Sequence, residues 1–234
     1  MRYNKLPEDF LRPTREDQLI HSQELISLHR IGKNSLHDFS RFVFDMYSYH
    51  YQKKYEWQPL QEDFEEAYHE DISQFDDSVY FAFKDMDGKI LGTIKTTLRQ
   101  NDLTFPIEKD FNINIEDFVN RSNWQVDQVW HLGRLAIDSY TLRGMQLSMT
   151  SKEMFRQLLI HSLSVINHQP GNLMIAESDV LIYRLFHELG VNMQIIGDVK
   201  DYMGSPTYPV VVTSEDLESW LTQNEHQSSI LQPA

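Results

Sequence analysis

With 234 residues, of which 41% are hydrophobic, the chain is long enough for one large domain or two small ones with a buried core. Its formal net charge of −14 argues against a nucleic-acid-binding protein, because no basic stripe is present to neutralise phosphates. The absence of cysteine excludes disulfides, thiolate metal sites and cysteine nucleophiles.

The N-terminal residues are polar, and we expect residues 1–20 to form an extended segment outside the domain. The opening stretch, MRYNKLPEDFLRPTRED, lacks the apolar core of about 7–15 residues that a secretory signal needs. No apolar run approaches the roughly 20 residues that span a bilayer. These features predict a cytoplasmic protein without an integral membrane segment.

Two segments that follow are predicted to be helical. In SLHDFSRFVFDMYSYHYQKKY (35–55) a capping serine precedes apolar residues at helical spacing, among them Phe39, Phe42, Val43 and Met46. The segment LQEDFEEAYHEDI (60–72) is strongly acidic, and we expect a shorter helix with one face in solvent.

Beyond residue 77 the periodicity indicates strands. SVYFAFKDMDGKILGTIKTTLRQ (78–100) contains two strand-like runs around an Asp87-Gly88 turn, which is a strong hairpin signal. VWHLGRLAI (129–137) and NLMIA (172–176) are further strands. VNMQIIGD (191–198) and YPVVVT (208–213) are expected to close the sheet as a pair.

Two helices alternate with these later strands. TSKEMFRQLLIHSLSVIN (150–167) has Thr150 or Ser151 as its N-cap and Glu153 completing a capping box. The buried stripe of this helix is expected to consist of Phe155, Leu158, Leu159, Leu163 and Ile166. DVLIYRLFHELG (179–190) ends at Gly190 in a C-cap position. The order of elements predicts an α/β fold, with one mixed sheet flanked by helices over residues 21–222 and a frayed tail over 223–234.

This order resembles the Gcn5-related N-acetyltransferase (GNAT) superfamily. The last motif of that superfamily commonly has an aromatic residue, two polar residues and Leu-Gly-Phe, and Phe186, Leu189, Gly190 and Val191 match it here. The resemblance implies a GNAT-like sheet in which the two central parallel strands splay apart.

One branch of the superfamily is more similar than the others, over about residues 38–212. It comprises the N-acyl amino acid synthases and the acyl-homoserine-lactone synthases. Its arginine–aromatic helix ending in tryptophan is matched by RFVFDMYSYHYQKKYEW (41–57), and its aspartate-rich turn before the hairpin by FDDSVYFAF (75–83). Its proline–phenylalanine segment is matched by FPIEKDF (105–111), and its Trp-Glu-Leu-Ser-Arg-Phe strand by VWHLGRLAID (129–138).

The chain departs from this pattern at several positions. SYTLRGMQLSMTSKEMF (139–155) lacks the second glycine of the pyrophosphate loop of ordinary acetyltransferases, which favours the synthase branch. The hairpin has Lys95 where the branch has arginine, and the strand has His131 and Gly133 where the branch has Glu and Ser. These differences argue against a strict lactone synthase.

The resemblance implies that a pantetheine arm enters the gap between segments 129–137 and 172–176 and pairs there like an added strand. Gly133 would leave room for the thioester, and the backbone amides of the arm-binding strand would come from Leu135, Ala136 and Ile137. Strict alternation puts His131 and Gly133 on one face of the strand. It puts Arg134 on the opposite face, with Trp130 and Leu132.

His131 is the candidate general base. An amine attacks a thioester only as the neutral base, so an ammonium with a pKa near 9 must lose a proton, and a neutral imidazole can accept it. The predicted catalytic residues are therefore His131 and Gly133. The alternatives are a buried histidine satisfied by hydrogen bonds, and a glycine that relieves a bulge or close packing.

A donor phosphate is predicted at the start of helix 150–167, where a helix N-terminus favours an anion. The residues gathered there are Arg143, Gly144, Lys152 and Arg156, and the alternative is an ordinary solvated helix end. Substrate binding is predicted for Arg41, Trp57, Lys95, Arg134 and Glu177. For Arg134 the alternative is an ion pair with an acidic helix, and Asp179 is expected to cap the helix that follows it.

Together these residues and the resemblance predict an N-acyltransferase. It would move an acyl group, expected to be fatty, to the amine of a small amino-acid-like acceptor. The acyl donor would be the phosphopantetheine thioester of acyl carrier protein or acyl-CoA, without a metal. Other hypotheses are an acyl-homoserine-lactone synthase, an acetyl-CoA-dependent acetyltransferase, a non-catalytic protein that binds acyl thioesters or lipids, and a degenerate structural subunit.

Overall fold

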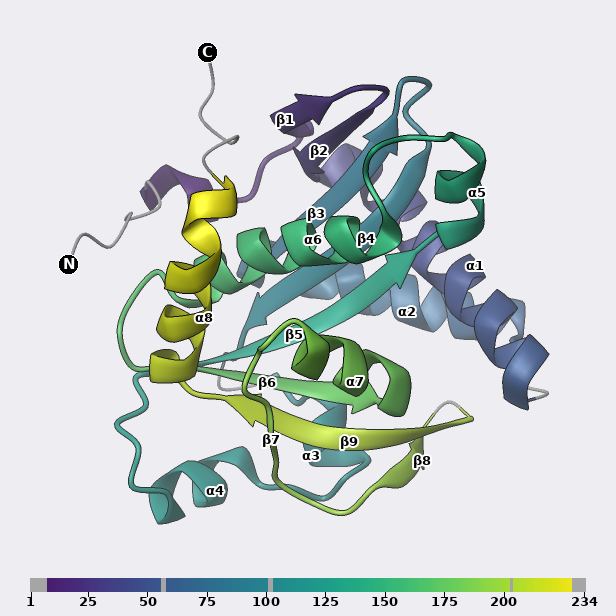
Figure 1. The fold of residues 1–234 in the computed structure, drawn as a ribbon. Helices are drawn as coiled ribbons and strands as arrows, with labels where there is room; N and C mark the ends of the chain where they lie inside the picture. The colour runs from purple at the N-terminus through teal and green to yellow at the C-terminus, as the bar shows by residue number, and fades with distance from the viewer. Residues whose placement is uncertain (1–7, 56–57, 101–102, 203, 229–234) are drawn as a thin grey trace.

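A nine-stranded mixed sheet forms the centre of the molecule (Figure 1). The computed structural model describes residues 8–55, 58–100, 103–202 and 204–228. The strand order is β1-β2-β3-β4-β5-β6-β9-β7, with β8 also paired to β9. The strands are β1 (Gln18–Gln23), β2 (Ile26–Arg30), β3 (Ser78–Asp85), β4 (Ile90–Leu98), β5 (Gln128–Ile137), β6 (Asn172–Asp179), β7 (Gln194–Ile195), β8 (Lys200–Tyr202) and β9 (Ser205–Val212).

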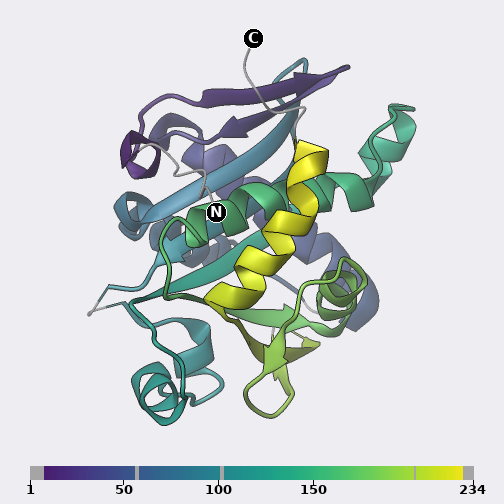
Figure 2. The ribbon, with the colours of Figure 1, turned by 60° about the vertical axis from the view of Figure 1, so that its left-hand side comes forward.

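Helices cover both faces of the sheet (Figures 1 and 2). Helix α6 packs on β3, β4 and β5 from one side with α8 against it, and α1 packs on β4 and β5 from the other side with α2 against it. The helices are α1 (Leu36–Tyr55), α2 (Gln61–Ser73), α3 (Pro106–Lys109), α4 (Ile115–Arg121), α5 (Ser139–Gly144), α6 (Ser151–Ile166), α7 (Val180–Glu188) and α8 (Ser214–Ser228). Short 3-10 turns occur at Glu8–Leu11, Lys33–Ser35 and Phe75–Asp77.

The strand alternation of β5 explains how two cores form on opposite faces. Trp130 and Leu132 belong to the large core under α6, whereas Val129 packs on the other face with residues of α3 and α4. The α6 stripe predicted from the sequence is buried as expected: Phe155, Leu158, Leu159, Leu163 and Ile166. A second core joins α1 to the sheet through Phe39, Val43 and Tyr80.

The predicted single-domain α/β architecture is confirmed, and so are its main elements. The hairpin turns at Gly88, whose φ of +83° is a conformation that glycine adopts without strain. Thr150 caps α6, because its Oγ1 accepts the Glu153 N–H at 3.1 Å. Every neighbouring pair of strands is antiparallel except β5 and β6, which are parallel as the resemblance implied.

Seven of the described strands and α-helices were not predicted as such: β1, β2, α3, α4, α5, β8 and α8. Strand β1 begins at Gln18 and α8 ends at Ser228, so both cross the boundaries placed at residues 20 and 222. β1 is a largely exposed edge strand of polar sequence, QLIHSQ, with no apolar alternation to mark it. In α8, by contrast, Leu217 and Trp220 are buried at helical spacing.

Among the described helices, none combines the length and apolar character needed to cross a lipid bilayer.

Candidate functional site

The two central parallel strands separate part-way along their length. They are paired from Gln128 opposite Asn172 to His131 opposite Ile175, and their pairing goes no further. Beyond that point β5 continues along β4, and β6 continues along β9 (Figure 1). The separation predicted around Gly133 therefore exists and begins directly after His131.

A β-bulge in β5 accompanies the separation. Lys95 pairs with Gly133 and Thr93 pairs with Ala136, so two residues of β5 oppose one of β4. One of these two is Arg134, whose φ is +54°, and the Thr93 hydroxyl donates to its carbonyl oxygen at 2.9 Å. A left-handed backbone is uncommon for a residue with a side chain and costs about 1–2 kcal/mol.

The bulge changes which face of the sheet Arg134 occupies. Its guanidinium contacts α2, as does the ammonium of Lys95 on β4. The expectation that Arg134 shares a face with Trp130 and Leu132 is wrong, because strict alternation fails where an extra residue is inserted. Arg134 instead lies on the face of His131.

The strand separation opens into a cavity of about 930 Å³. Its walls are formed by residues 131–137 of β5, residues 176–179 of β6, the second half of α1, the start of α6, and α7. On the α6–α7 side the lining is apolar and includes Phe155, Leu181, Leu185, Phe186 and Met193. Small-molecule sites usually measure about 300–1,000 Å³, so this one is at the large end.

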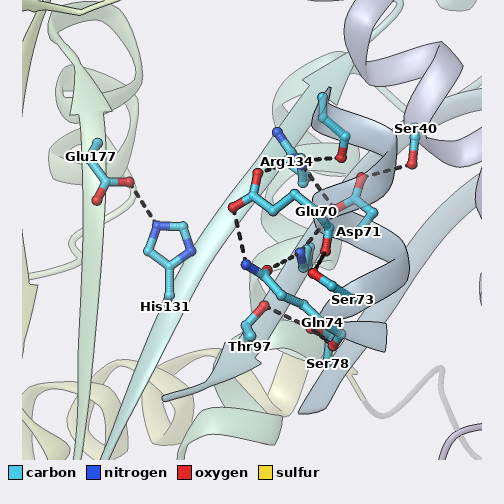
Figure 3. A network of polar contacts seen from close by, with 12 residues as sticks. Ser40, Glu70, Asp71, Ser73, Gln74, Ser78, Thr97, His131, Arg134 and Glu177 are labelled. Carbon is cyan, nitrogen blue, oxygen red and sulfur yellow. Dashed lines mark hydrogen bonds and ion pairs between the residues drawn. The ribbon is translucent and has the colours of Figure 1, made fainter. Parts of the chain in front are cut away.

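His131 and Glu177 face each other across the point where the strands part (Figure 3). The His131 Nε2 and Glu177 Oε2 atoms are 2.7 Å apart, and both side chains are mostly buried. The other carboxylate oxygen of Glu177 accepts the backbone N–H of Ile107 at 2.6 Å. Phe105 stacks on the imidazole with ring centroids 4.5 Å apart and planes 13° from parallel.

A buried charge network lies beside this pair, between β4, β5 and α2 (Figure 3). Asp71 Oδ1 accepts from Lys95 Nζ at 2.9 Å and from Arg134 Nε at 3.1 Å, and its Oδ2 accepts from the Ser40 hydroxyl at 2.7 Å. Arg134 also donates from Nη2 to Glu70 at 2.8 Å. The acidic segment predicted to have a solvated face therefore directs one carboxylate into the interior, with its side chain only 1% exposed.

These contacts set the charge states in the network. Burial opposes the ionisation of Asp71, but the Arg134 and Lys95 cations outweigh it and hold the pKa of the carboxyl below its usual range. Burial also lowers the pKa of the Lys95 ammonium, against the opposing attraction of Asp71.

Two tyrosines line the cavity from opposite sides, Tyr47 on α1 and Tyr202 on β8. Burial raises the pKa of Tyr47 to about 12 and raises that of Tyr202 as well. Both phenols therefore keep their hydroxyl hydrogens at neutral pH and can donate hydrogen bonds into the cavity. No sequence pattern indicated Tyr202, because it lies in a strand of only three residues.

The predicted donor-phosphate residues are only partly brought together. Lys152 lines the cavity at the start of α6 and lies 3.5 Å from Glu188. Arg143 is exposed and donates to the Ser139 carbonyl, whereas Arg156 is held by Glu153. Neither arginine, nor Gly144, lines the cavity; the strand residues Leu135, Ala136 and Ile137 do.

The predicted substrate-binding residues also divide. Glu177, Lys95 and Arg134 line the cavity, and Arg134 makes the ion pairs with an acidic helix that were its alternative reading. The Arg41 guanidinium instead lies 3.4 Å above the ring centre of Phe64, between α1 and α2 and away from the cavity lining. Trp57 lies outside the described residues.

The expected helix cap is present. Asp179 Oδ1 accepts the backbone N–H groups of Leu181 and Ile182 at 2.7 and 2.9 Å, and so caps α7. Within the described ranges there is no group of three or more His, Asp or Glu side chains arranged to hold a metal ion.

Comparison with known proteins identifies the fold. No protein-family model matches the sequence, and no curated protein is similar to it. Among solved structures, FeeM, an N-acyl amino acid synthase from uncultured soil microbes, matches with a TM-score of 0.64, covering 86% of this chain and 99% of FeeM. The fold is GNAT-like. The sequence identity to FeeM is only 13%.

Two acyl-homoserine-lactone synthases share this fold. LasI matches with a TM-score of 0.55 and 13% identity, covering 87% of this chain and 96% of LasI. The CoA-dependent enzyme BjaI, solved with SAM and isopentyl-CoA, matches with a TM-score of 0.53 and 13% identity, covering 86% of each chain. The GNAT-like fold with splayed central strands, expected from the sequence, is thus confirmed.

Proposed function

We propose that the protein is an N-acyltransferase, which moves an acyl group from a thioester to the amine of a small acceptor. The observation that carries the proposal is the end of β5–β6 pairing at His131 and Ile175, directly beside the His131–Glu177 contact in the wall of the large cavity. The named activities of FeeM, LasI and BjaI agree with it.

The reaction needs a proton acceptor and a place for the thioester. The acceptor nitrogen forms a bond to the thioester carbonyl carbon, the carbon–sulfur bond breaks, and the thiolate leaves and takes up a proton. His131 accepts the proton that the attacking ammonium loses. Beyond His131 the β5 backbone has no partner on β6, so it is free to pair with the pantetheine arm and to stabilise the oxyanion.

The donor is proposed to carry a fatty acyl chain, as acyl-CoA or as the phosphopantetheine thioester of acyl carrier protein. The apolar wall formed by Phe155, Leu185, Phe186 and Met193 supports a long chain over an acetyl group. Burial of each methylene is worth about 0.8 kcal/mol, so such a wall selects for chain length.

The acceptor is proposed to be amino-acid-like. Its amine would lie near His131, and its carboxylate near Arg134, whose side chain is 20% exposed and lines the cavity. Arginine is well suited to a planar carboxylate because its guanidinium offers several donors in fixed positions.

The direct test is a substrate screen. Purified protein is mixed with acyl-CoA and acyl carrier protein thioesters from acetyl to hexadecanoyl, and with amino acids or SAM as amine sources. Free thiol and the N-acyl product are measured by mass spectrometry. We expect an N-acyl amino acid with a chain longer than acetyl. Tight thioester binding without amide formation would instead favour a non-catalytic binding protein, and turnover of acetyl-CoA alone an acetyltransferase.

Charge reversal at Lys152 tests where the donor phosphate binds. Lys152→Glu is expected to raise KM for the thioester by about 5–10-fold, because replacing attraction to the phosphate by repulsion weakens binding by about 1 kcal/mol in total. The effect should shrink at high salt. The control is Arg121→Glu, an exposed cation on α4 outside the cavity lining. Equal KM values for the Lys152 variant and the native protein would place the phosphate elsewhere.

A further inference from the structure

We infer that Glu177 is a positioning residue, which fixes the proton of His131 on Nε2 so that Nδ1 is the atom that accepts the proton from the amine. This inference rests on the proposed function and assigns roles within the same site. It gives Glu177 a part different from the substrate binding predicted from the sequence.

The hydrogen bonds of Glu177 determine the tautomer. A carboxylate can only accept, and its Oε1 already accepts the Ile107 N–H at 2.6 Å. Its Oε2, 2.7 Å from His131 Nε2, must therefore also accept a hydrogen. A neutral imidazole has a single N–H, so the proton lies on Nε2 and the lone pair lies on Nδ1.

The ring is held in this orientation by contacts that need no substrate. Phe105 stacks on one face of the imidazole, and Glu177 is itself fixed by the backbone of α3 through Ile107. His131 lies on β5 and Glu177 on β6, so their contact spans the two strands where backbone pairing ends. The base is thus oriented before an acceptor binds.

Gly133 leaves the Nδ1 side of the ring open. A Cβ atom at position 133 would lie 2.9 Å from His131 Cε1 and 3.4 Å from Nδ1, but 4.0 Å from Nε2. A side chain here would therefore push on the ring and cover its accepting edge. His131 and Gly133, the two departures from the synthase branch noted in the sequence, are therefore linked. The imidazole ring at 131 occupies space that a side chain at 133 would need.

Glu177→Gln reverses the tautomer without changing the shape of the side chain. The amide oxygen of glutamine can still accept the Ile107 N–H, which turns the amide NH₂ toward His131 Nε2. The ring must then accept at Nε2 and carry its proton on Nδ1, so the base no longer faces the amine. We expect kcat to fall about 100-fold or more, since holding the wrong tautomer removes general-base catalysis. The matched control is Glu116→Gln on α4, whose exposed carboxylate pairs with Arg99 and does not line the cavity.

The tautomer is read directly by two-bond ¹H–¹⁵N correlation spectra of ¹⁵N-histidine-labelled protein at pH 8, with the His131 signals assigned from their absence in His131→Ala. We expect an Nε2–H ring in the native protein and an Nδ1–H ring in Glu177→Gln. An Nδ1–H ring in the native protein, or an unchanged tautomer in the variant, would overturn the inference. This readout needs no turnover, so it is separate from the substrate screen, whose failure would overturn the proposed function itself.

Gly133→Ala tests access to Nδ1. We expect the Nε2–H tautomer to remain, while kcat falls at least about 10-fold and the thermal midpoint of unfolding changes little. Native kcat in a folded Gly133→Ala protein would contradict the assignment of Nδ1 as the accepting atom.

Discussion

His131→Ala is expected to lower kcat for N-acyl transfer by about 10²–10⁴-fold, the usual contribution of a positioned general base. The loss should depend on pH. An amino-acid ammonium with a pKa near 9 supplies its own neutral form at high pH, so the residual rate of the variant should rise with pH up to about pH 9 and level off above it. The native enzyme should gain much less over that range, because His131 already removes the proton.

The measurement is thiol release with a saturating acyl thioester and amine, from pH 6 to pH 10. His69→Ala, which removes an exposed imidazole on α2 outside the cavity lining, is the control and should retain native kcat. Turnover by His131→Ala equal to that of the native protein at pH 7 would remove His131 from the mechanism. Circular dichroism of both variants separates a catalytic loss from unfolding.

The elements that form the site were readable from the sequence where local periodicity decides the structure. The Asp87-Gly88 turn, the Thr150 cap and the apolar stripe of α6 are local signals, and all three are confirmed. The gap between β5 and β6 was also expected, but through the resemblance and not through periodicity. Periodicity describes one strand at a time, whereas a gap depends on which strands are neighbours.

The position of Arg134 shows why the rest of the site was not readable. A β-bulge is set by how two strands pair. Gly133, whose alternative role was to relieve a bulge, directly precedes the inserted residue, but a glycine alone does not show which following side chain changes face. Strict alternation therefore assigned this cation to the wrong face. The same limit applies to Asp71. It is one of several acids in a strongly acidic helix, and the partners that accommodate its burial, Lys95, Arg134 and Ser40, lie on other elements.

The residues predicted to bind the donor phosphate lie apart in the structure for a similar reason. Lys152 and Arg156 are four residues apart in sequence, yet Arg156 is held by Glu153 and also contacts Asn224 on α8. Because α8 was not predicted, its contact with this side of α6 was not foreseen. A cluster of charges in sequence becomes a site only where every member faces the same space.

Asp71→Asn is expected to destabilise the fold by about 3–5 kcal/mol, the range measured when one partner of a buried ion pair is removed. The side chains of Asp71 and Lys95 are 1% and 4% exposed, so the variant leaves the ammonium with little access to water. An asparagine also turns an NH₂ donor toward cations or toward the Ser40 hydroxyl, which now donates to Asp71. Urea unfolding measures the loss, and Asp117→Asn, whose carboxylate is exposed, should change stability by less than about 1 kcal/mol.

The double variant Asp71→Asn with Lys95→Met distinguishes an uncompensated charge from lost packing. Removing the stranded ammonium should restore part of the stability, so the two substitutions are not additive. Additive losses would show that Lys95 and Asp71 do not act as a pair.

Acid titration independently tests whether the ionised carboxylate of Asp71 stabilises the folded protein. The pKa of Asp71 is lower in the folded protein than in the unfolded chain, where an aspartate titrates near 3.9, so the unfolded state binds the proton more readily. The stability that this carboxylate provides is therefore complete well above pH 4 and is lost as the pH falls through the lower, folded value. In Asp71→Asn that part of the acid dependence should be absent. Curves of unfolding free energy against pH for the native protein and the variant should therefore converge below about pH 4. Parallel curves down to pH 2 would mean that the carboxylate does not hold the two cations of β4 and β5 in the interior, and the charged wall of the cavity would then need another explanation.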